Sequence, residues 1–146
     1  MIWDELVDSA RNESGLWAGS LLPDGRREPD AVFSPLAPEA FALGMETIYE
    51  AYLVHYGSSR LFASPGDEER VLLGDYLYAH GLVRVAEAGG VPAVAVLAEL
   101  IARCSALQAD DAGGDGDAWL DAVRALGGDP DDEAVAHALE LHAARV

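Results

Sequence analysis

The sequence contains no lysine, and its nine basic residues are all arginine. Against these nine stand 26 acidic residues, which give the chain a formal net charge of −17. A surface with this charge repels the phosphate backbone of nucleic acids and anionic lipids, so neither is expected as a partner. The excess of acid is typical of a soluble protein and also fits a cation or a basic partner; composition alone does not choose between these.

Cysteine is almost absent too. The single Cys104 excludes an internal disulfide, and its place in an apolar segment predicts a buried thiol. The N-terminal stretch carries Asp4 and Glu5 and has neither a basic nor an apolar leader region, unlike a signal peptide. The longest uninterrupted apolar run, residues 91–98, is far shorter than the ~20 residues that cross a bilayer. We therefore predict a cytoplasmic protein without a membrane span.

Regular alternation of polar and apolar residues, the signal of a half-buried strand, is also missing. The length of 146 residues corresponds to a single domain over residues 1–146, and 51% hydrophobic residues, many of them alanine, suit closely packed helices. We predict an all-α bundle of about six helices. Two of these, Val71–Ala88 and Pro92–Leu107, are apolar on nearly all sides and are expected at the centre of the bundle.

The rest of the chain supplies shorter helices and two irregular segments. Helices are predicted over residues 2–11, 38–56, 118–126 and 131–144. Residues 16–38 are rich in proline and glycine and predict an irregular loop. Residues 109–117 predict a flexible, acidic, glycine-rich linker. This segment fails as a calcium loop, because the twelfth position counted from Asp111 is Ala122, where a bidentate glutamate belongs.

Asp75 is the unusual residue of helix 71–88. Helical geometry puts it in the middle of the apolar arc, while the expected wet side is formed by His80, Arg84 and Glu87. A buried carboxylate without a partner is too costly to keep, so Asp75 needs a donor such as His55, Ser58 or Arg60. We interpret Asp75, His55, Ser58 and Arg60 as a structural polar cluster in the core. Helix 38–56 is expected to expose Glu46 and Glu50.

Residues 46–107 also carry two short motifs in a definite order. A helix with His55-x-x-Ser58 is followed by a loop, then by a helix that begins with Gly74-Asp75-Tyr76-Leu77. This order resembles the middle of the trans-polyprenyl diphosphate synthases, over less than half of the chain. In that family, DDxxD clusters on two facing helices hold the magnesium ions that bind the diphosphate. Here residues 59–63 contain no acid at all.

The missing acids decide what the resemblance implies. The two Asp-Asp pairs elsewhere, at 110–111 and 131–132, lie in a glycine-rich segment and at a helix start, and cannot supply the metal-bound carboxylates for ionising an allylic diphosphate. The chain thus resembles the small, non-catalytic subunit of two-component prenyl diphosphate synthases, which pairs with a catalytic subunit. No catalytic residue, metal or cofactor is expected. Interface candidates on the two apolar helices are Ala79, Val83, Leu97 and Leu100.

Two other hypotheses stay open. The chain is a stand-alone all-α homodimeric interaction protein if the resemblance reflects only alanine-rich helices. It is a metal-dependent enzyme if the carboxylates of residues 110–117, or Asp75 with His80, bind a cation. Self-association or a catalytic prenyl synthase partner would separate the first two, and titration with divalent cations would test the third.

Overall fold

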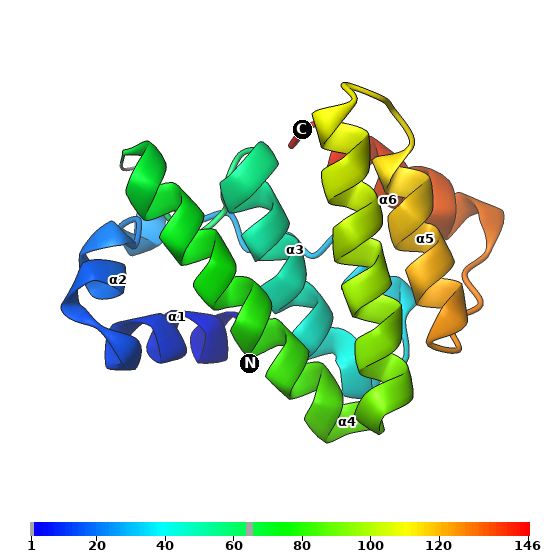
Figure 1. Cartoon of the computed structure of the whole chain (residues 1–146), viewed down its shortest axis with the longest axis horizontal. Coiled ribbons are helices and arrows are strands. Elements are labelled where there is room, and N and C mark those ends of the chain that lie inside the picture. The colour runs from blue at the N-terminus through cyan, green and yellow to red at the C-terminus, as the bar shows by residue number, and fades with distance from the viewer. Residues whose placement is uncertain (1, 64–65) are drawn as a thin grey trace.

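Helix α3 (Ala42–Tyr56) is the centre of the fold, and its residues 44–54 are all buried. The computed structural model describes residues 2–63 and 66–146, and Figure 1 shows α3 in the middle of the molecule with the other helices on either side of it. These are α1 (Ile2–Glu13), α2 (Gly15–Ser20), α4 (Asp67–Ala109), α5 (Asp115–Ala125) and α6 (Asp132–Ala143). In this part of the chain the only β pairing is one isolated bridge, between Leu21 and Phe62. The prediction of an all-α fold with about six helices is confirmed.

The segment before α3 is more ordered than predicted. The sequence predicts an irregular loop over residues 16–38, yet α2 lies at its start, because the Ser14 hydroxyl accepts a hydrogen bond from the Trp17 N–H at 3.1 Å. Trp17 is buried and stacks on Tyr76, with 5.7 Å between ring centroids. Three short 3₁₀ turns follow, at Asp24–Arg26 (η1), Ser34–Leu36 (η2) and Glu39–Phe41 (η3). The predicted helix 38–56 therefore becomes α-helical only at Ala42.

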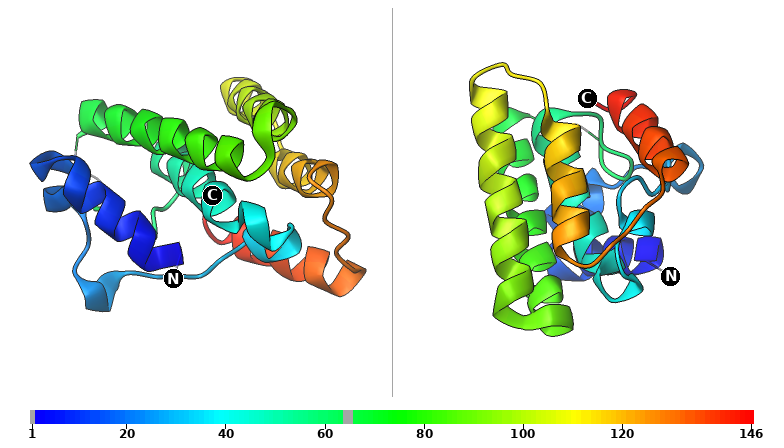
Figure 2. Two further views of the ribbon diagram at one scale, coloured as in Figure 1. Left: turned by 90° about the horizontal axis from the view of Figure 1, so that it is seen from below. Right: turned by 90° about the vertical axis from the view of Figure 1, so that its right-hand side faces the viewer.

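Helix α4 folds back on itself at Gly90. The φ and ψ angles there are 68° and −161°, a conformation that glycine adopts without strain, and Pro92 lies two residues further on. We call residues 67–89 the first limb, residues 91–109 the second limb, and both together the α4 hairpin. The two limbs diverge from the bend and lie across α3 (Figures 1 and 2). They contain the two apolar helices that the sequence predicts.

Two glycines set how closely the first limb approaches α3. A Cβ atom built on Gly44 would lie 2.6 Å from Cγ2 of Val85 and 3.3 Å from the carbonyl oxygen of Gly81. A Cβ atom on Gly81 would overlap the side chain of Ile48. The helices therefore touch backbone to backbone, which is the close approach that the glycines of helix 71–88 predict. An alanine at either position would force the helices apart.

The buried face of the first limb is the face that carries its glycines. Leu73, Leu77 and Val85 are buried with them, whereas Leu72 and Val83 on the opposite face are each 56% exposed. The prediction that His80, Arg84 and Glu87 form the solvent-exposed side is wrong in part, because the side chain of Arg84 turns inward. Its guanidinium donates to the hydroxyls of Thr47 at 2.7 Å and Ser9 at 2.6 Å. The hairpin thus packs one apolar arc on α3 and leaves a second apolar arc at the surface.

Candidate functional site

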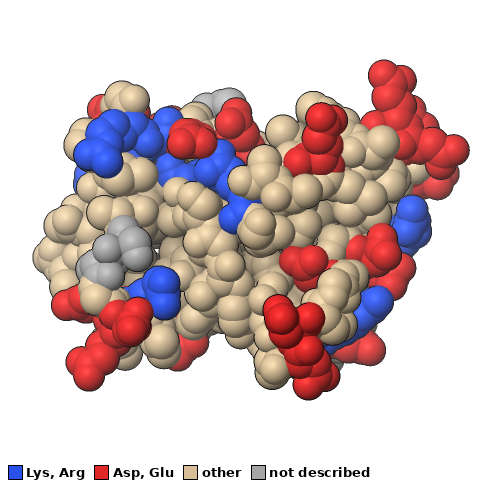
Figure 3. Space-filling model, turned by 90° about the horizontal axis from the view of Figure 1, so that it is seen from above, with Lys and Arg blue, Asp and Glu red and all other residues tan. Residues whose placement is uncertain are grey.

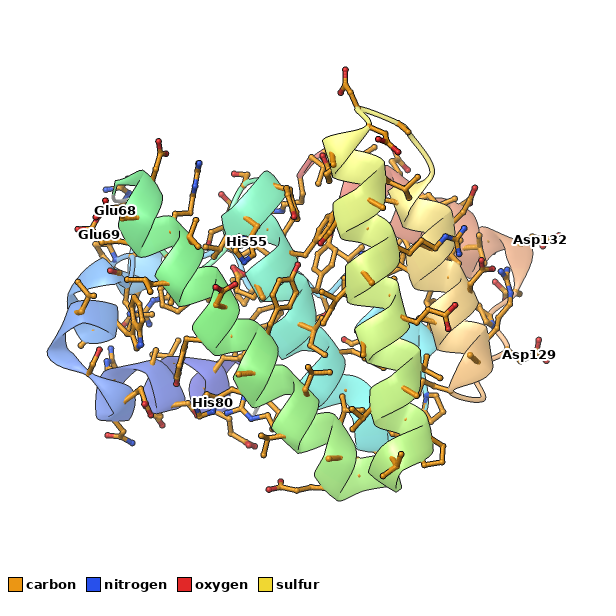
Figure 4. All side chains as sticks on the ribbon, viewed as in Figure 1. His55, Glu68, Glu69, His80, Asp129 and Asp132 are labelled. Atoms are coloured by element: carbon orange, nitrogen blue, oxygen red, sulfur yellow. The ribbon has the colours of Figure 1, made fainter. Side chains whose placement is uncertain are left out.

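His55 and Asp75, which carry the resemblance, do lie side by side. Nε2 of His55 is 3.4 Å from Oδ1 of Asp75, and the imidazole lies so close to Gly74 that a methyl group there would overlap it. Figure 4 shows His55 beside the first limb. Burial lowers the pKa of His55, and the Asp75 carboxylate offsets this only in part. The ring is therefore neutral at pH 7 and fixes the spacing of α3 and α4.

The expectation that Asp75 belongs to the core is wrong. Its side chain is 67% exposed, because the arc in which it is centred faces outward. Ser58 is also exposed, while Arg60 is buried in another place. Of the four residues predicted as one polar cluster, only His55 and Asp75 meet. An exposed carboxylate needs no buried donor, so the physical reason for expecting the cluster no longer applies.

Arg60 lies between two buried glutamates of α3. Its Nη1 is 2.8 Å from Oε2 of Glu46, and its Nε is 3.4 Å from Oε2 of Glu50. The backbone N–H of Arg60 donates to Oε1 of Glu50 at 2.9 Å, and Nη1 donates to the carbonyl of Asp30 at 2.8 Å. Burial lowers the pKa of Arg60, but Glu50 and Glu46 together raise it above its usual value. We call Glu46, Glu50 and Arg60 the ion cluster.

The ion cluster overturns the prediction that Glu46 and Glu50 face water. The chain reverses at Gly57, and this turn returns Arg60 to the face of α3 that carries both glutamates. The guanidinium also lies 4.7 Å from the ring centroid of Trp3 and 5.0 Å from that of Tyr49. The cluster is closed to water, so it is a structural device that joins α3 to the segment after it.

A second, partly buried network joins α3, α4, α5 and α6. Oδ2 of Asp115 accepts hydrogen bonds from the Tyr52 hydroxyl at 2.7 Å and from Nε2 of His142 at 2.8 Å. Nδ1 of His142 is 2.7 Å from the Tyr49 hydroxyl, and Gln108 donates to the Tyr52 hydroxyl at 2.7 Å. We call these five residues the Asp115 network. The arrangement of carboxylate, imidazole and hydroxyl is like that of a proton relay, but Tyr49 is buried and burial raises its pKa.

The Asp115 network corrects the prediction for residues 109–117. The chain is irregular only over residues 110–114, and Asp115 lies in the first turn of α5, where a carboxylate is favoured. Sequence reasoning missed this because the partners of Asp115 are distant in sequence. Cys104 is buried as predicted, and burial together with Asp115 raises the pKa of its thiol to about 12. The thiol is therefore not a nucleophile at neutral pH.

The Asp115 network makes folding stability depend on acid pH. Burial alone would raise the pKa of Asp115, but hydrogen bonds from Tyr52 and His142 lower it below its ordinary value. The carboxylate therefore stabilises the fold fully above its unfolded pKa of about 3.9, and this stabilisation is lost as pH falls through the folded value. We expect Asp115→Asn to lower the free energy of unfolding by about 1.5–3 kcal/mol at pH 7.

Urea unfolding at pH values from 7 down to 3 tests this expectation. The difference between wild type and Asp115→Asn should narrow below pH 4. Asp121→Asn is the matched control, because Asp121 is exposed beside Arg103, and it should cost less than about 1 kcal/mol. An Asp115→Asn difference that stays constant over this pH range would contradict the role of the carboxylate.

The outer face of the α4 hairpin is apolar and exposed, and packing of the core does not account for it. The first limb exposes Leu72, Ala79, Val83 and Ala86, and the second exposes Val91, Ala95, Ala98 and Ala102. We call these eight residues the outer face. At its N-terminal end, Val71 and Leu72 line a shallow hollow of about 470 Å³. Two predicted interface residues, Ala79 and Val83, lie on the outer face, but Leu97 and Leu100 are buried in the chain's own core and cannot reach a partner.

Helix α4 is long and apolar enough, by length and composition alone, to cross a membrane. An 18-residue window in it has a mean hydropathy of 1.7, and 22% of that window is buried. Both limbs pack one side against the rest of the chain, on α3 and α5. Most of this apolar window therefore lies outside the buried core.

Within residues 2–63 and 66–146, no group of three or more His, Cys, Asp or Glu side chains converges as a metal site would require. Comparison of the chain with models of known families, with curated proteins and with solved structures finds no match. The candidate site is therefore identified from the structure alone, and it is the outer face.

Proposed function

We propose that this chain is a non-catalytic, isoprenoid-synthase-like helical subunit that binds a protein partner through the outer face of the α4 hairpin. The observation that carries the proposal is the exposure of large aliphatic side chains on one hairpin. Val71, Leu72 and Val83 are 51–56% exposed, and Val91 is 82% exposed. Exposed apolar side chains grouped on one surface, unlike scattered ones, mark an interaction site.

The residue types of the outer face suit a helical partner. Alanine occupies five of its eight positions, and small side chains let a second helix approach closely, as Gly44 and Gly81 do inside the chain. The larger Leu72, Val83 and Val91 supply apolar area, at about 25 cal/mol for each Å² removed from water. The outer face therefore combines close packing with side chains that anchor a partner.

The sequence supports a prenyl diphosphate synthase as the kind of partner. The order His55, Ser58, Gly74, Asp75 resembles that family, and the contact of His55 with Gly74 and Asp75 fits a shared helix arrangement. Residues 59–63 lack the acids that bind magnesium in that family, which supports a subunit that does not itself perform the reaction. The partner would then supply the catalytic site.

Co-purification with a catalytic prenyl diphosphate synthase from the same source tests the proposal. We expect Val83→Glu to weaken the complex tenfold or more, about 1.4 kcal/mol, because the interface would bury an unpaired charge. Leu16→Glu is the matched control: Leu16 is 49% exposed on α2, away from the outer face, and should bind like wild type. Equal binding by both variants would contradict the proposal.

The alternative is that the outer face binds a second copy of the chain. The mass measured by light scattering decides between the two partners, since a self-associating chain doubles its 15.4 kDa without any synthase present. A dimer that Val83→Glu dissociates and Leu16→Glu preserves would replace the synthase proposal with a homodimeric interaction protein.

A further inference from the structure

The cations of the α4 hairpin are all engaged within the chain. Arg70 pairs with Asp67 at 3.1 Å, and Arg103 pairs with Asp121 at 2.8 Å. Arg84 points away from the outer face and donates to Thr47 and Ser9. None of the three arginines is therefore available to meet an acidic partner at the outer face.

Among the described residues, three acids of the hairpin have no such partner. Glu68, Glu87 and Glu99 are exposed, and in the described part of the chain none of them forms an ion pair. Glu68 borders the hollow that Val71 and Leu72 line, and Asp75 lies among the apolar residues of the first limb. Figure 4 shows Glu68 at the N-terminal end of α4. The apolar outer face thus has an acidic border of Glu68, Asp75, Glu87 and Glu99.

The rest of the surface reinforces this charge. Seen from the end where α4 begins, acidic side chains occur on several sides, while most of the arginine surface gathers in one patch (Figure 3). Two copies that met through their outer faces would bring two acidic borders together, each on a chain of net charge −17. Like charges that face each other across an interface disfavour that pairing, and opposite charges favour association and raise its rate.

We infer that the partner of the outer face is a helix with an apolar stripe bordered by arginine or lysine, and this inference rests on the proposed function. Its stripe packs on Leu72, Ala79 and Val83, and its cations meet Glu68, Glu87 and Glu99. Because these acids are exposed at the edge of the interface, they act chiefly on the rate of association and on its salt dependence. The apolar contacts hold the complex together once it has formed.

Three synthetic helical peptides with one leucine and alanine stripe test this inference. Their border positions carry arginine, glutamine or glutamate, and binding to the full chain is measured by fluorescence anisotropy. We expect the arginine peptide to bind about tenfold more tightly than the glutamine peptide at 50 mM salt, with the advantage falling at 300 mM. The glutamate peptide should bind most weakly. Val83→Glu should abolish binding of every peptide.

A charge-matched pair of variants identifies the acids responsible. Glu68→Gln/Glu87→Gln/Glu99→Gln should reduce binding of the arginine peptide about five- to tenfold and leave the glutamine peptide unchanged. Asp129→Asn/Asp132→Asn/Glu140→Gln removes the same charge at exposed positions outside the hairpin and should bind like wild type; Figure 4 shows Asp129 and Asp132 far from the first limb. Equal losses in both variants would overturn the inference, because net charge alone would explain them.

The outcomes separate the inference from the proposed function. Equal binding of the arginine and glutamine peptides, both lost in Val83→Glu, would overturn the basic border and keep the outer face as an interface. Binding of all three peptides that is insensitive to Val83→Glu would overturn both. A chain that forms its own dimer through the outer face would overturn the basic partner.

Discussion

Arg60→Met is expected to lower the free energy of unfolding by about 3–5 kcal/mol, which is the cost of removing one charged partner from a buried ion cluster. Arg60, Glu46 and Glu50 are all at most 1% exposed, so water cannot take over the role of the guanidinium. Methionine leaves both glutamates in the core without a cation. It also removes the hydrogen bond to the carbonyl of Asp30. The free energy of unfolding of an ordinary domain is about 5–15 kcal/mol, so this loss is a large part of it.

Urea unfolding at pH 7 measures this loss, with Arg70→Met as the matched control. Arg70 also pairs with an acid, Asp67, but at the surface, so its replacement should cost less than about 1 kcal/mol. The triple variant Glu46→Gln/Glu50→Gln/Arg60→Met should recover at least half of the stability lost in Arg60→Met, because no unpaired charge remains in the core. Similar costs for Arg60→Met and Arg70→Met would show that the cluster is not closed to water.

The sequence predicts the helices of this fold better than it predicts their orientation. Helix 71–88 has two apolar arcs, and hydrophobic periodicity cannot say which of them is buried when both are apolar. The arc with Gly74 and Gly81 packs on α3, because only there can two backbones approach closely. The glycines mark the buried arc, whereas the prediction that both arcs are buried is wrong for the arc with Asp75.

The residues missed by sequence reasoning depend on partners distant along the chain. Glu46 and Glu50 are glutamates one turn apart, typical of a wet helix face, and only the turn at Gly57 brings Arg60 against them. Asp115 has the neighbours of a flexible linker, yet it meets His142 from α6. Such pairings follow from how the elements pack, which local residue patterns do not encode. Of the four interface residues that the sequence predicts, Ala79 and Val83 lie on the outer face, whereas Leu97 and Leu100 do not.

Trp119→Ala is expected to destabilise the fold by about 3–5 kcal/mol, because it removes the largest side chain of the core. Trp119 reaches from α5 to α3 and to the segment before it. Its ring stacks on Phe33 at 5.5 Å between centroids and meets the edge of Tyr49 at 5.0 Å. The same ring lies 6.1 Å from Tyr52, whose hydroxyl bonds Asp115. Alanine would therefore leave a cavity and loosen the Asp115 network together with it.

Trp119→Phe keeps an aromatic ring at this position and so removes less volume than alanine does. The indole Nε1 is buried and has no hydrogen-bond partner in the described part of the chain, so phenylalanine loses packing alone and should cost only about 1–2 kcal/mol. Urea unfolding gives both values, and hydrogen exchange of the α5 amides shows where the fold opens. In Trp119→Ala these amides should exchange faster than those of α3, since α5 depends on this ring for its attachment while α3 is enclosed on all sides. Equal acceleration in α3 and α5 would mean that α5 does not open separately, and that the aromatic cluster and α3 unfold as one unit.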